Sequence, residues 1–311
     1  MHLSVGYLGI RLLSDLQEYR ERSGDHRSVV NAYESHDHVY ETAAFRPTTV
    51  VVRGSGIVAA RVLQRLFDDR EGRNAPTKIV HLFRNYVDGP QGDHATFRRP
   101  GGRGFAYQGF NFPKASWGGQ LRERLEGASP EERAELIDAL GGTNVPKRRV
   151  WQRQMDRGLA NGSYEQRVGE VEGVRAAPAG GLVLEVGGDG GRYEVAADFV
   201  IDATGLVADI GQDRLIGDLL ERGGARRNPK GRLDVGTSFD VLGAESDPGK
   251  LYASGSITLG GPYAGVDSFL GLQYSALAIA DDLARAGFCR RIGPGRSISQ
   301  WWRWVRGRSP D

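Results

Sequence analysis

The chain has 311 residues, of which 39% are apolar and 26% charged, and its formal net charge is only +2. This composition is typical of a globular protein of one or two domains, and the near-neutral charge disfavours nucleic acid as the main partner. The single cysteine, Cys289, excludes an internal disulfide, a Cys-x-x-Cys redox pair and a four-cysteine metal site. No apolar run approaches the roughly 18–20 residues that span a membrane, and no basic segment precedes the first apolar residues, so we expect a cytoplasmic protein.

The first 47 residues contain one clear helical pattern. Apolar residues recur at helical spacing in residues 10–20, and Gly24 provides a stop. Further on, Glu34, His36 and His38 alternate along what would be one face of a strand, as metal ligands can. Three ligands in such strict succession rarely close a metal site, so we favour a polar edge or loop and expect no metal.

Residues 49–60 read TVVVRGSGIVAA and carry the strongest motif of the chain. Thr49–Arg53 is short, apolar and β-branched, as a buried parallel strand is. Apolar residues then recur at helical spacing up to Gly72, and Lys78–Phe83 has the composition of a second buried strand. The glycines therefore lie between a strand and a helix, the context in which G-x-G-x-x-A binds a dinucleotide.

Each residue of this motif has a physical role in such a cradle. Gly54 permits a tight turn, Gly56 lets the backbone approach a pyrophosphate, and Ala59 lets the helix pack closely on the strand. Ser55 and Ile57 complete the predicted cofactor contacts at the helix N-terminus, which faces the phosphates. The alternative is an ordinary glycine-rich turn between a strand and a helix.

The residue after the second strand helps to choose the cofactor. An NAD site usually offers a carboxylate there to the ribose hydroxyls. Here the segment reads LFRNY, with Arg84 and no carboxylate before Asp88. Arg84 is suited to a 2′-phosphate, which predicts NADP(H), and the alternative is a solvated arginine at a strand end.

Residues 96–164 are longer than an ordinary connection, so we expect an inserted helical subdomain there. Ser129 is in an N-cap position and predicts the start of a helix. Ahead of it, aromatic residues are interleaved with glycines and polar residues. Tyr107, Asn111 and Lys114 are the candidate substrate contacts in this stretch, and the alternative is packing of the insert against the nucleotide-binding domain.

Residues 163–205 predict a β-meander that leads into one more buried strand. Three short strands are separated by glycine-rich turns, and the apolar strand Phe199–Asp202 follows. After it come Ala203, Thr204 and Gly205, which we expect to close the nucleotide site.

The last part of the chain predicts a strand, a glycine-rich loop and a helix. Leu251–Ser254 has the composition of a strand that reaches Gly255 and Ser256, and Leu270–Ala286 has that of an alanine-rich helix ended by Gly287.

The C-terminal tail, SISQWWRWVRGRSPD, holds Trp301, Trp302 and Trp304. We expect two of the three tryptophans to seal the core or an oligomer interface, and the alternative is contact with a membrane surface or a partner.

The order of these motifs resembles that of the flavoproteins with two dinucleotide-binding domains, which include the flavin monooxygenases. The resemblance covers about residues 48–95 and 165–287 and rests on the glycine motif, the meander, FVIDATG, and LYASG with its following helix. It implies FAD and NADP(H) as cofactors, a small-molecule substrate, and an oxidoreductase in which NADPH passes hydride to flavin. It also implies cofactor contacts for residues 203–205 and for Gly255 and Ser256.

The sequence departs from this family in two ways that matter. It has one glycine fingerprint, so either an N-terminal FAD-binding segment is missing, or Gly54 begins the FAD domain itself and residues 1–47 are an extension. The late motif reads Gly255-Ser256 where the family has Gly-Asp, and a serine cannot accept hydrogen bonds as a carboxylate does. A degenerate or truncated nucleotide-binding protein and a flavin dehydrogenase that is not an oxygenase are therefore the alternative functions.

We thus expect an α/β fold: a Rossmann-like parallel sheet with a β-meander, an inserted helical subdomain and remnants of a second, FAD-type domain. The expected divisions are a connecting or remnant segment (1–47), the NAD(P)-binding domain (48–95 and 165–210), the insert (96–164), and a return to the FAD-type domain with the tail (211–311). The sequence identifies no residue as a catalytic acid or base. As partners we expect a small-molecule substrate and possible self-association, without nucleic acid or membrane.

Overall fold

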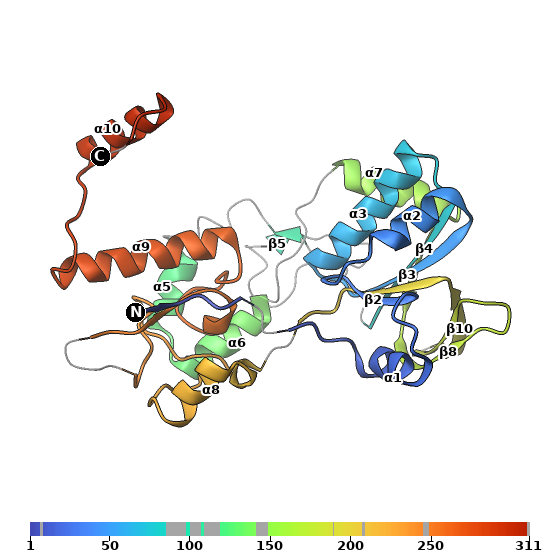
Figure 1. The fold of residues 1–311 in the computed structure, drawn as a ribbon, viewed down its shortest axis with the longest axis horizontal. Coiled ribbons are helices and arrows are strands. Elements are labelled where there is room, and N and C mark those ends of the chain that lie inside the picture. The colour runs from blue at the N-terminus through green and yellow to red at the C-terminus, as the bar shows by residue number, and fades with distance from the viewer. Residues whose placement is uncertain are drawn as a thin grey trace.

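The computed structural model describes residues 1–6, 9–84, 119–140, 149–188, 190–206, 209–244 and 249–309, with the backbone of two short strands, β5 (Arg98–Arg99) and β6 (Tyr107–Gln108). Figure 1 shows two lobes and a C-terminal helix that lies apart from both. We call them the sheet lobe, formed by residues 13–84 and 149–206, and the second lobe, formed by residues 1–6, 119–140 and 209–285.

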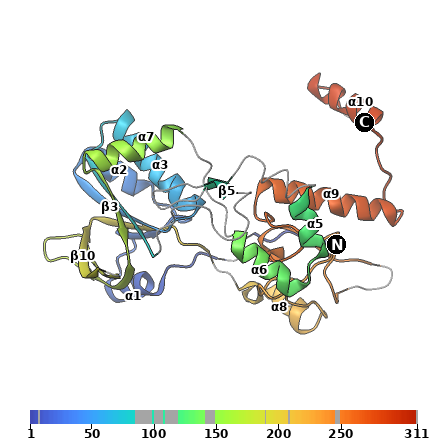
Figure 2. The ribbon, with the colours of Figure 1, turned by 180° about the vertical axis from the view of Figure 1, so that it is seen from behind.

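The sheet lobe is built on a five-stranded parallel sheet in the order β2-β11-β3-β4-β7. Helices α2, α3 and α7 cover one face, and α1 and the meander cover the other (Figures 1 and 2). Strand β3 is buried along almost its whole length, as an apolar strand of a parallel sheet is when both faces are covered. The sheet and helices of this lobe are α1 (Ser14–Ser23), β2 (Val29–Asn31), α2 (Asp37–Phe45), β3 (Thr48–Arg53), α3 (Ile57–Gly72), β4 (Thr77–Phe83), α7 (Arg149–Ala160), β7 (Tyr164–Val168) and β11 (Phe199–Asp202).

The meander is a separate antiparallel sheet in the order β10-β9-β8. Its strands are β8 (Glu170–Ala176), β9 (Leu182–Gly188) and β10 (Gly191–Ala197). Gly181 and Gly191 have φ angles of 81° and 99° at its turns, a conformation that glycine adopts without steric cost. The predicted Rossmann-like sheet with its meander is therefore confirmed.

The second lobe brings the N-terminal residues together with a segment late in the chain. Strand β1 (His2–Leu3) pairs in parallel with β12 (Tyr252–Ala253), about 250 residues later in sequence. The lobe also contains α5 (Gln120–Gly127), α6 (Pro130–Leu140), η2 (Ile210–Gln212), α8 (Arg214–Glu221), η3 (Ser256–Thr258) and α9 (Phe269–Arg285). Its core gathers Leu3, Leu233, Phe239 and Ile257, which are almost fully buried. Among the described residues, no helix is both long and apolar enough to cross a bilayer.

The segment 1–47 contributes more to the sheet lobe than the sequence indicated. Val29–Asn31 forms β2 and pairs with β11, although three residues are too few to be recognised as a strand by periodicity. Helix α1 ends where predicted, because Gly24 takes a left-handed conformation with φ of 69°.

The region of the alternating histidines is a turn and a helix rather than a strand. His36 donates to the carbonyl oxygen of Glu34 at 2.6 Å, and His38 contacts the carbonyl oxygen of Arg27 at 2.8 Å. The histidines therefore point to different partners. Among the described residues, no three His, Cys, Asp or Glu side chains lie close enough together to hold a metal ion.

The described helices of the expected insert divide between the two lobes. Helices α5 and α6 form an apolar cluster with Leu259 and Ala264 of the second lobe, whereas α7 packs into the sheet lobe through Trp151 and Met155. The predicted cap of α6 is present as a capping box: the amide of Glu132 donates to Ser129 Oγ at 3.2 Å, and the Ser129 amide donates to the Glu132 carboxylate at 2.9 Å.

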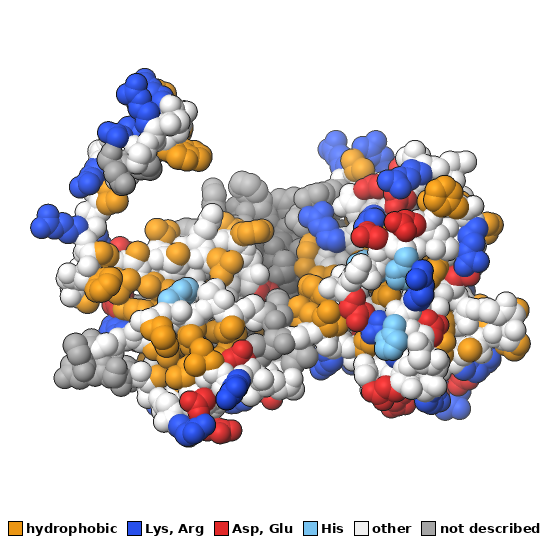
Figure 3. Space-filling model, in the orientation of Figure 1, with side chains coloured by type: hydrophobic (Ala, Val, Ile, Leu, Met, Phe, Trp, Pro, Cys, Tyr) orange, Lys and Arg blue, Asp and Glu red, His pale blue; other side chains and the backbone are white. Residues whose placement is uncertain are grey.

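Helix α10 (Pro294–Val305) lies away from both lobes, and none of its residues is buried (Figures 1 and 3). Trp301, Trp302 and Trp304 are 55%, 48% and 66% exposed. The expectation that two of them seal the core of this chain is wrong, and an oligomer interface stays a prediction.

Candidate functional site

The loop after β3 is held tightly between neighbouring strands. Gly54 has a φ angle of 123°, and a Cβ atom there would lie 2.7 Å from the carbonyl oxygen of Ala203 at the end of β11. The Gly54 amide donates to the carbonyl oxygen of Leu82 on β4 at 3.0 Å. Only glycine fits this conformation and this close approach without strain.

The N-terminus of α3, which follows, is open. A Cβ atom on Gly56 would meet nothing within 4 Å, and no side chain caps the helix. Among the described residues, the amides of Ser55 and Gly56 donate no hydrogen bond. Unpaired amides at a helix N-terminus, together with the positive end of the helix dipole, favour an anion.

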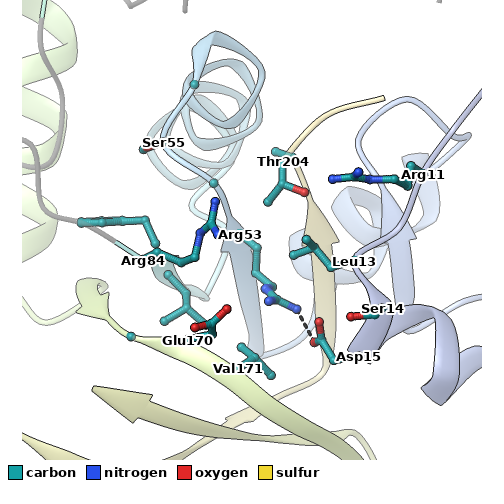
Figure 4. A pocket seen from close by; sticks show the side chains of 16 residues that line it. Arg11, Leu13, Ser14, Asp15, Arg53, Ser55, Arg84, Glu170, Val171 and Thr204 are labelled. Atoms are coloured by element: carbon teal, nitrogen blue, oxygen red, sulfur yellow. Dashed lines mark hydrogen bonds and ion pairs between the residues drawn. The ribbon is translucent and has the colours of Figure 1, made fainter. Parts of the chain in front are cut away.

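A cleft of about 500 Å³ opens at this corner, where the carboxyl ends of β3, β4 and β11 meet (Figure 4). This edge of an open parallel sheet is where ligands bind in doubly wound folds. The residues that line the cleft come from the loop after β3, the end of β4, the start of the meander, the turn after β11 and the start of α1: Arg11, Leu13, Ser14, Asp15, Arg53, Gly54, Ser55, Gly56, Leu82, Phe83, Arg84, Gly169, Glu170, Val171, Ala203 and Thr204.

Cations outnumber carboxylates in the wall of this cleft. Arg53 at the end of β3 is almost buried and forms an ion pair with Asp15 in the first turn of α1 (Figure 4). Arg11 and Arg84 line the same cleft and form no ion pair with any described residue. Glu170 is the other carboxylate, so the cleft keeps one excess positive charge beside the α3 N-terminus, which suits a phosphate group.

The turn after β11 is held by a buried carboxylate. Asp202 is fully buried and accepts hydrogen bonds from the Leu13 amide at 2.9 Å, the Thr204 amide at 3.0 Å and Thr204 Oγ1 at 2.6 Å. These bonds join the turn to the start of α1. Asp202 therefore fixes two walls of the cleft without lining it.

The structure brings together part of the predicted cofactor site. Gly54, Ser55, Gly56, Arg84, Ala203 and Thr204 all line the cleft. Ala59 is buried in the core of the sheet lobe, as the small helix residue of the motif was expected to be. Ile57, a predicted cofactor contact, packs against the same core and does not line the cleft. Gly205 follows the turn with φ of 140° and does not line the cleft.

The other predicted site residues lie elsewhere. Gly255 and Ser256 are in the second lobe, where Gly255 has φ of 85° and Ser256 is buried at the start of η3. Tyr107 is in β6, whose backbone alone is described, and Asn111 and Lys114 lie outside the described residues.

Sequence reasoning missed the residues that reach the cleft from distant elements. Arg11, Ser14 and Asp15 come to it because β2 and α1 pack beside β11, which no local pattern reveals. Arg53 was visible as an arginine at the end of an apolar strand, a signal that a charged side chain leaves the sheet at the site.

No protein-family model and no curated protein match the chain, whereas solved structures match its fold. Ornithine hydroxylase PvdA from Pseudomonas aeruginosa gives a TM-score of 0.59 at 19% identity, covering 91% of this chain and 61% of that protein. Cadaverine monooxygenase DfoA from Erwinia amylovora, solved bound to FAD, gives 0.64 at 14% identity, covering 94% and 63%. Ornithine N-hydroxylase KtzI from Kutzneria sp. 744, solved with reduced FAD, NADP+ and L-ornithine, gives 0.60 at 16% identity, covering 92% and 63%.

The chain shares its fold with these two ornithine hydroxylases and this cadaverine monooxygenase. The expected likeness to FAD- and NAD(P)-binding flavoproteins is thereby confirmed for the fold. The chain spans between 61% and 63% of the length of these three proteins.

Proposed function

We propose that the cleft binds NADP(H), with the pyrophosphate over the N-terminus of α3. The observation that carries this proposal is the uncapped helix end, preceded by Gly54-Ser55-Gly56, which opens on a cleft of about 500 Å³ with excess positive charge. Arg84 at the end of β4 takes the 2′-phosphate, because that strand end is where the adenine ribose lies in dinucleotide folds. Arg11 provides a second cation at the opposite wall.

We further propose that the protein is an FAD- and NADP(H)-dependent monooxygenase acting on the primary amine of a small molecule. The support is the shared fold with enzymes named for ornithine and cadaverine, two of them solved with FAD. In such an enzyme the nicotinamide supplies a hydride that the flavin accepts. The part of this chain's own residues is to bind and orient the dinucleotide in the cleft. We place the protein in the cytoplasm, with self-association as a further possibility and without nucleic acid or membrane partners.

A second candidate function is nucleotide binding without flavin activity of the chain's own. It is favoured by the single glycine fingerprint and by Ser256 at the position where the family has an aspartate. The flavin part of the proposal therefore rests on the shared fold, whereas the NADP(H) part rests on the cleft. A flavin dehydrogenase that does not react productively with oxygen is the third candidate.

Three measurements on the purified protein separate these candidates. Flavin absorption bands, present as isolated or after mixing with FAD, are expected for the monooxygenase and the dehydrogenase and absent for the plain nucleotide-binding protein. Anaerobic mixing with NADPH should bleach the bands. Oxygen uptake that rises on addition of ornithine, lysine or cadaverine and yields a hydroxylamine supports the monooxygenase, and bleaching without such uptake supports the dehydrogenase.

A further inference from the structure

We propose that His81 is a positioning residue that holds the glycine loop so that the Ser55 amide faces the dinucleotide phosphates. The proposal rests on the proposed binding of NADP(H) in the cleft. His81 lies on β4, is fully buried, and does not line the cleft. Its Nε2 atom is 2.6 Å from the carbonyl oxygen of Gly54, the first glycine of the loop.

The direction of every hydrogen bond in this contact is fixed by its neighbours. A carbonyl oxygen only accepts, so Nε2 of His81 carries the proton and Nδ1 is left as an acceptor. Nδ1 lies 2.9 Å from the hydroxyl of Tyr164 on β7, which therefore donates to it. The same hydroxyl accepts from Gln166 Nε2 at 3.2 Å. A continuous series of donors thus runs from the edge strand β7 through β4 to the loop.

The surroundings keep the imidazole neutral, as this series requires. Burial lowers the pKa of His81 to about 4, well below its ordinary value of 6.5. The described groups around the ring are the Tyr164 hydroxyl and the Phe83 ring, whose centroid is 4.6 Å away, and neither carries a charge at neutral pH. Nε2 therefore stays a donor toward Gly54 with Nδ1 unprotonated.

The contact matters because it decides which way a peptide group points. Glycine at position 54, with φ of 123°, has no Cβ atom to restrict the orientation of the peptide that follows it. The C=O and N–H of a trans peptide point in opposite directions. With the Gly54 carbonyl held on the side of the sheet covered by α3, the Ser55 N–H points away from His81, and Ser55 lies in the wall of the cleft.

The test compares NADP+ affinity, measured by calorimetry, in four proteins. His81→Leu removes both hydrogen bonds at similar volume and should weaken binding at least about tenfold. His81→Gln places an amide N–H near the position of Nε2 and should restore the affinity to within about threefold of wild type. The control is Ile79→Ala, which perturbs the same buried face of β4 without touching Gly54. It should lower the melting temperature and leave the affinity unchanged. Equal weakening in Ile79→Ala, or full affinity in His81→Leu, overturns the proposal.

A ligand-free measurement separates failure of this inference from failure of the proposed function. If wild-type protein does not bind NADP+, the proposed function fails and the tautomer is still measurable. Long-range 1H–15N spectra of 15N-histidine-labelled protein at pH 7 should show a neutral histidine signal protonated at Nε2 that is absent from His81→Gln and altered in Tyr164→Phe. Protonation of that histidine at Nδ1, or a charged ring, contradicts the assignment.

Discussion

At Gly54 the absence of a methyl group permits the loop conformation. Gly54→Ala would place Cβ 2.7 Å from the Ala203 carbonyl oxygen in a backbone with φ of 123°. We expect a loss of about 2 kcal/mol or more in the free energy of unfolding, measured with urea. Gly72→Ala, at the end of α3 with nothing within 4 Å, is the control and should be neutral or slightly stabilising. Equal stability of the two variants would show that the loop is not held as described.

The buried imidazole of His81 predicts a pH dependence of stability. Its pKa is lowered to about 4 by burial, whereas in the unfolded chain it returns to about 6.5. Between these values the unfolded state binds a proton that the folded state does not, so stability falls as the pH is lowered. Between pH 7.5 and 5 wild type should lose about 2 kcal/mol more than His81→Gln, as measured by urea unfolding. Parallel curves for the two proteins would contradict this.

Residues that act within a contiguous segment could be predicted from the sequence, and residues brought in from other segments could not. The glycines, Arg84 and the turn at Ala203 and Thr204 follow strands directly, so their position at the sheet edge follows from the parallel topology. Arg11 and Asp15 belong to the segment 1–47, whose described strands, β1 and β2, have only two and three residues. Their place in the cleft depends on packing that leaves no local signal.

At the scale of elements, the bonds of Asp202 tie β11 to α1. Asp202→Ala removes three hydrogen bonds to a buried carboxylate and should cost about 3 kcal/mol of unfolding free energy. Thr204→Val removes only the hydroxyl bond and should cost about 1 kcal/mol. Chemical denaturation of both variants measures whether the loss of unfolding free energy is larger in Asp202→Ala than in Thr204→Val. A Thr204→Val loss as large as that of Asp202→Ala would mean that the bonds from the Leu13 and Thr204 amides contribute nothing.

Helix α10, unlike β11 and α1, adds nothing to the described core. None of its residues is buried, and its three tryptophans are about half exposed or more. Removal of residues 294–311 should change the unfolding free energy by no more than about 0.5 kcal/mol. A large loss would show that the tail packs on the chain, and a change in the mass measured by light scattering would show that it joins two copies.

Elements with strong periodicity or capping were predicted well, and their partners were not. The helix after Gly56, the meander and the helix capped at Ser129 form as their patterns indicate. The division of α5, α6 and α7 between the lobes follows from which apolar faces meet, a long-range property. The histidine region, which we expected to be a polar edge or loop, forms a turn and the start of α2, because alternation over so short a stretch does not distinguish a strand from a helix.

At the scale of the whole molecule, the chain begins in the second lobe and later returns to complete it. It passes twice through the sheet lobe, with α5 and α6 of the second lobe between the two passages. The pairing of β1 with β12 closes this path, and the Met1 ammonium donates to the Lys250 carbonyl oxygen at 3.2 Å. The family resemblance alone led us to expect that residues 211–311 return to an FAD-type domain, and the assignment to FAD stays a prediction. No physical rule links residues 1–3 to residues 251–254 in advance. Apart from Arg11, every residue that lines the cleft belongs to the sheet lobe.

The central claim is that the open end of α3 holds a dinucleotide, and calorimetric titration of wild type and Gly56→Asp with NADP+ tests it most directly. Gly56 faces open space, so aspartate there leaves the fold intact and puts bulk and negative charge where the pyrophosphate would lie. We predict one saturable site per chain in wild type, and binding weakened at least about 100-fold in Gly56→Asp at an unchanged melting temperature. No saturable binding to wild type, or equal affinity in a folded Gly56→Asp, would contradict the account.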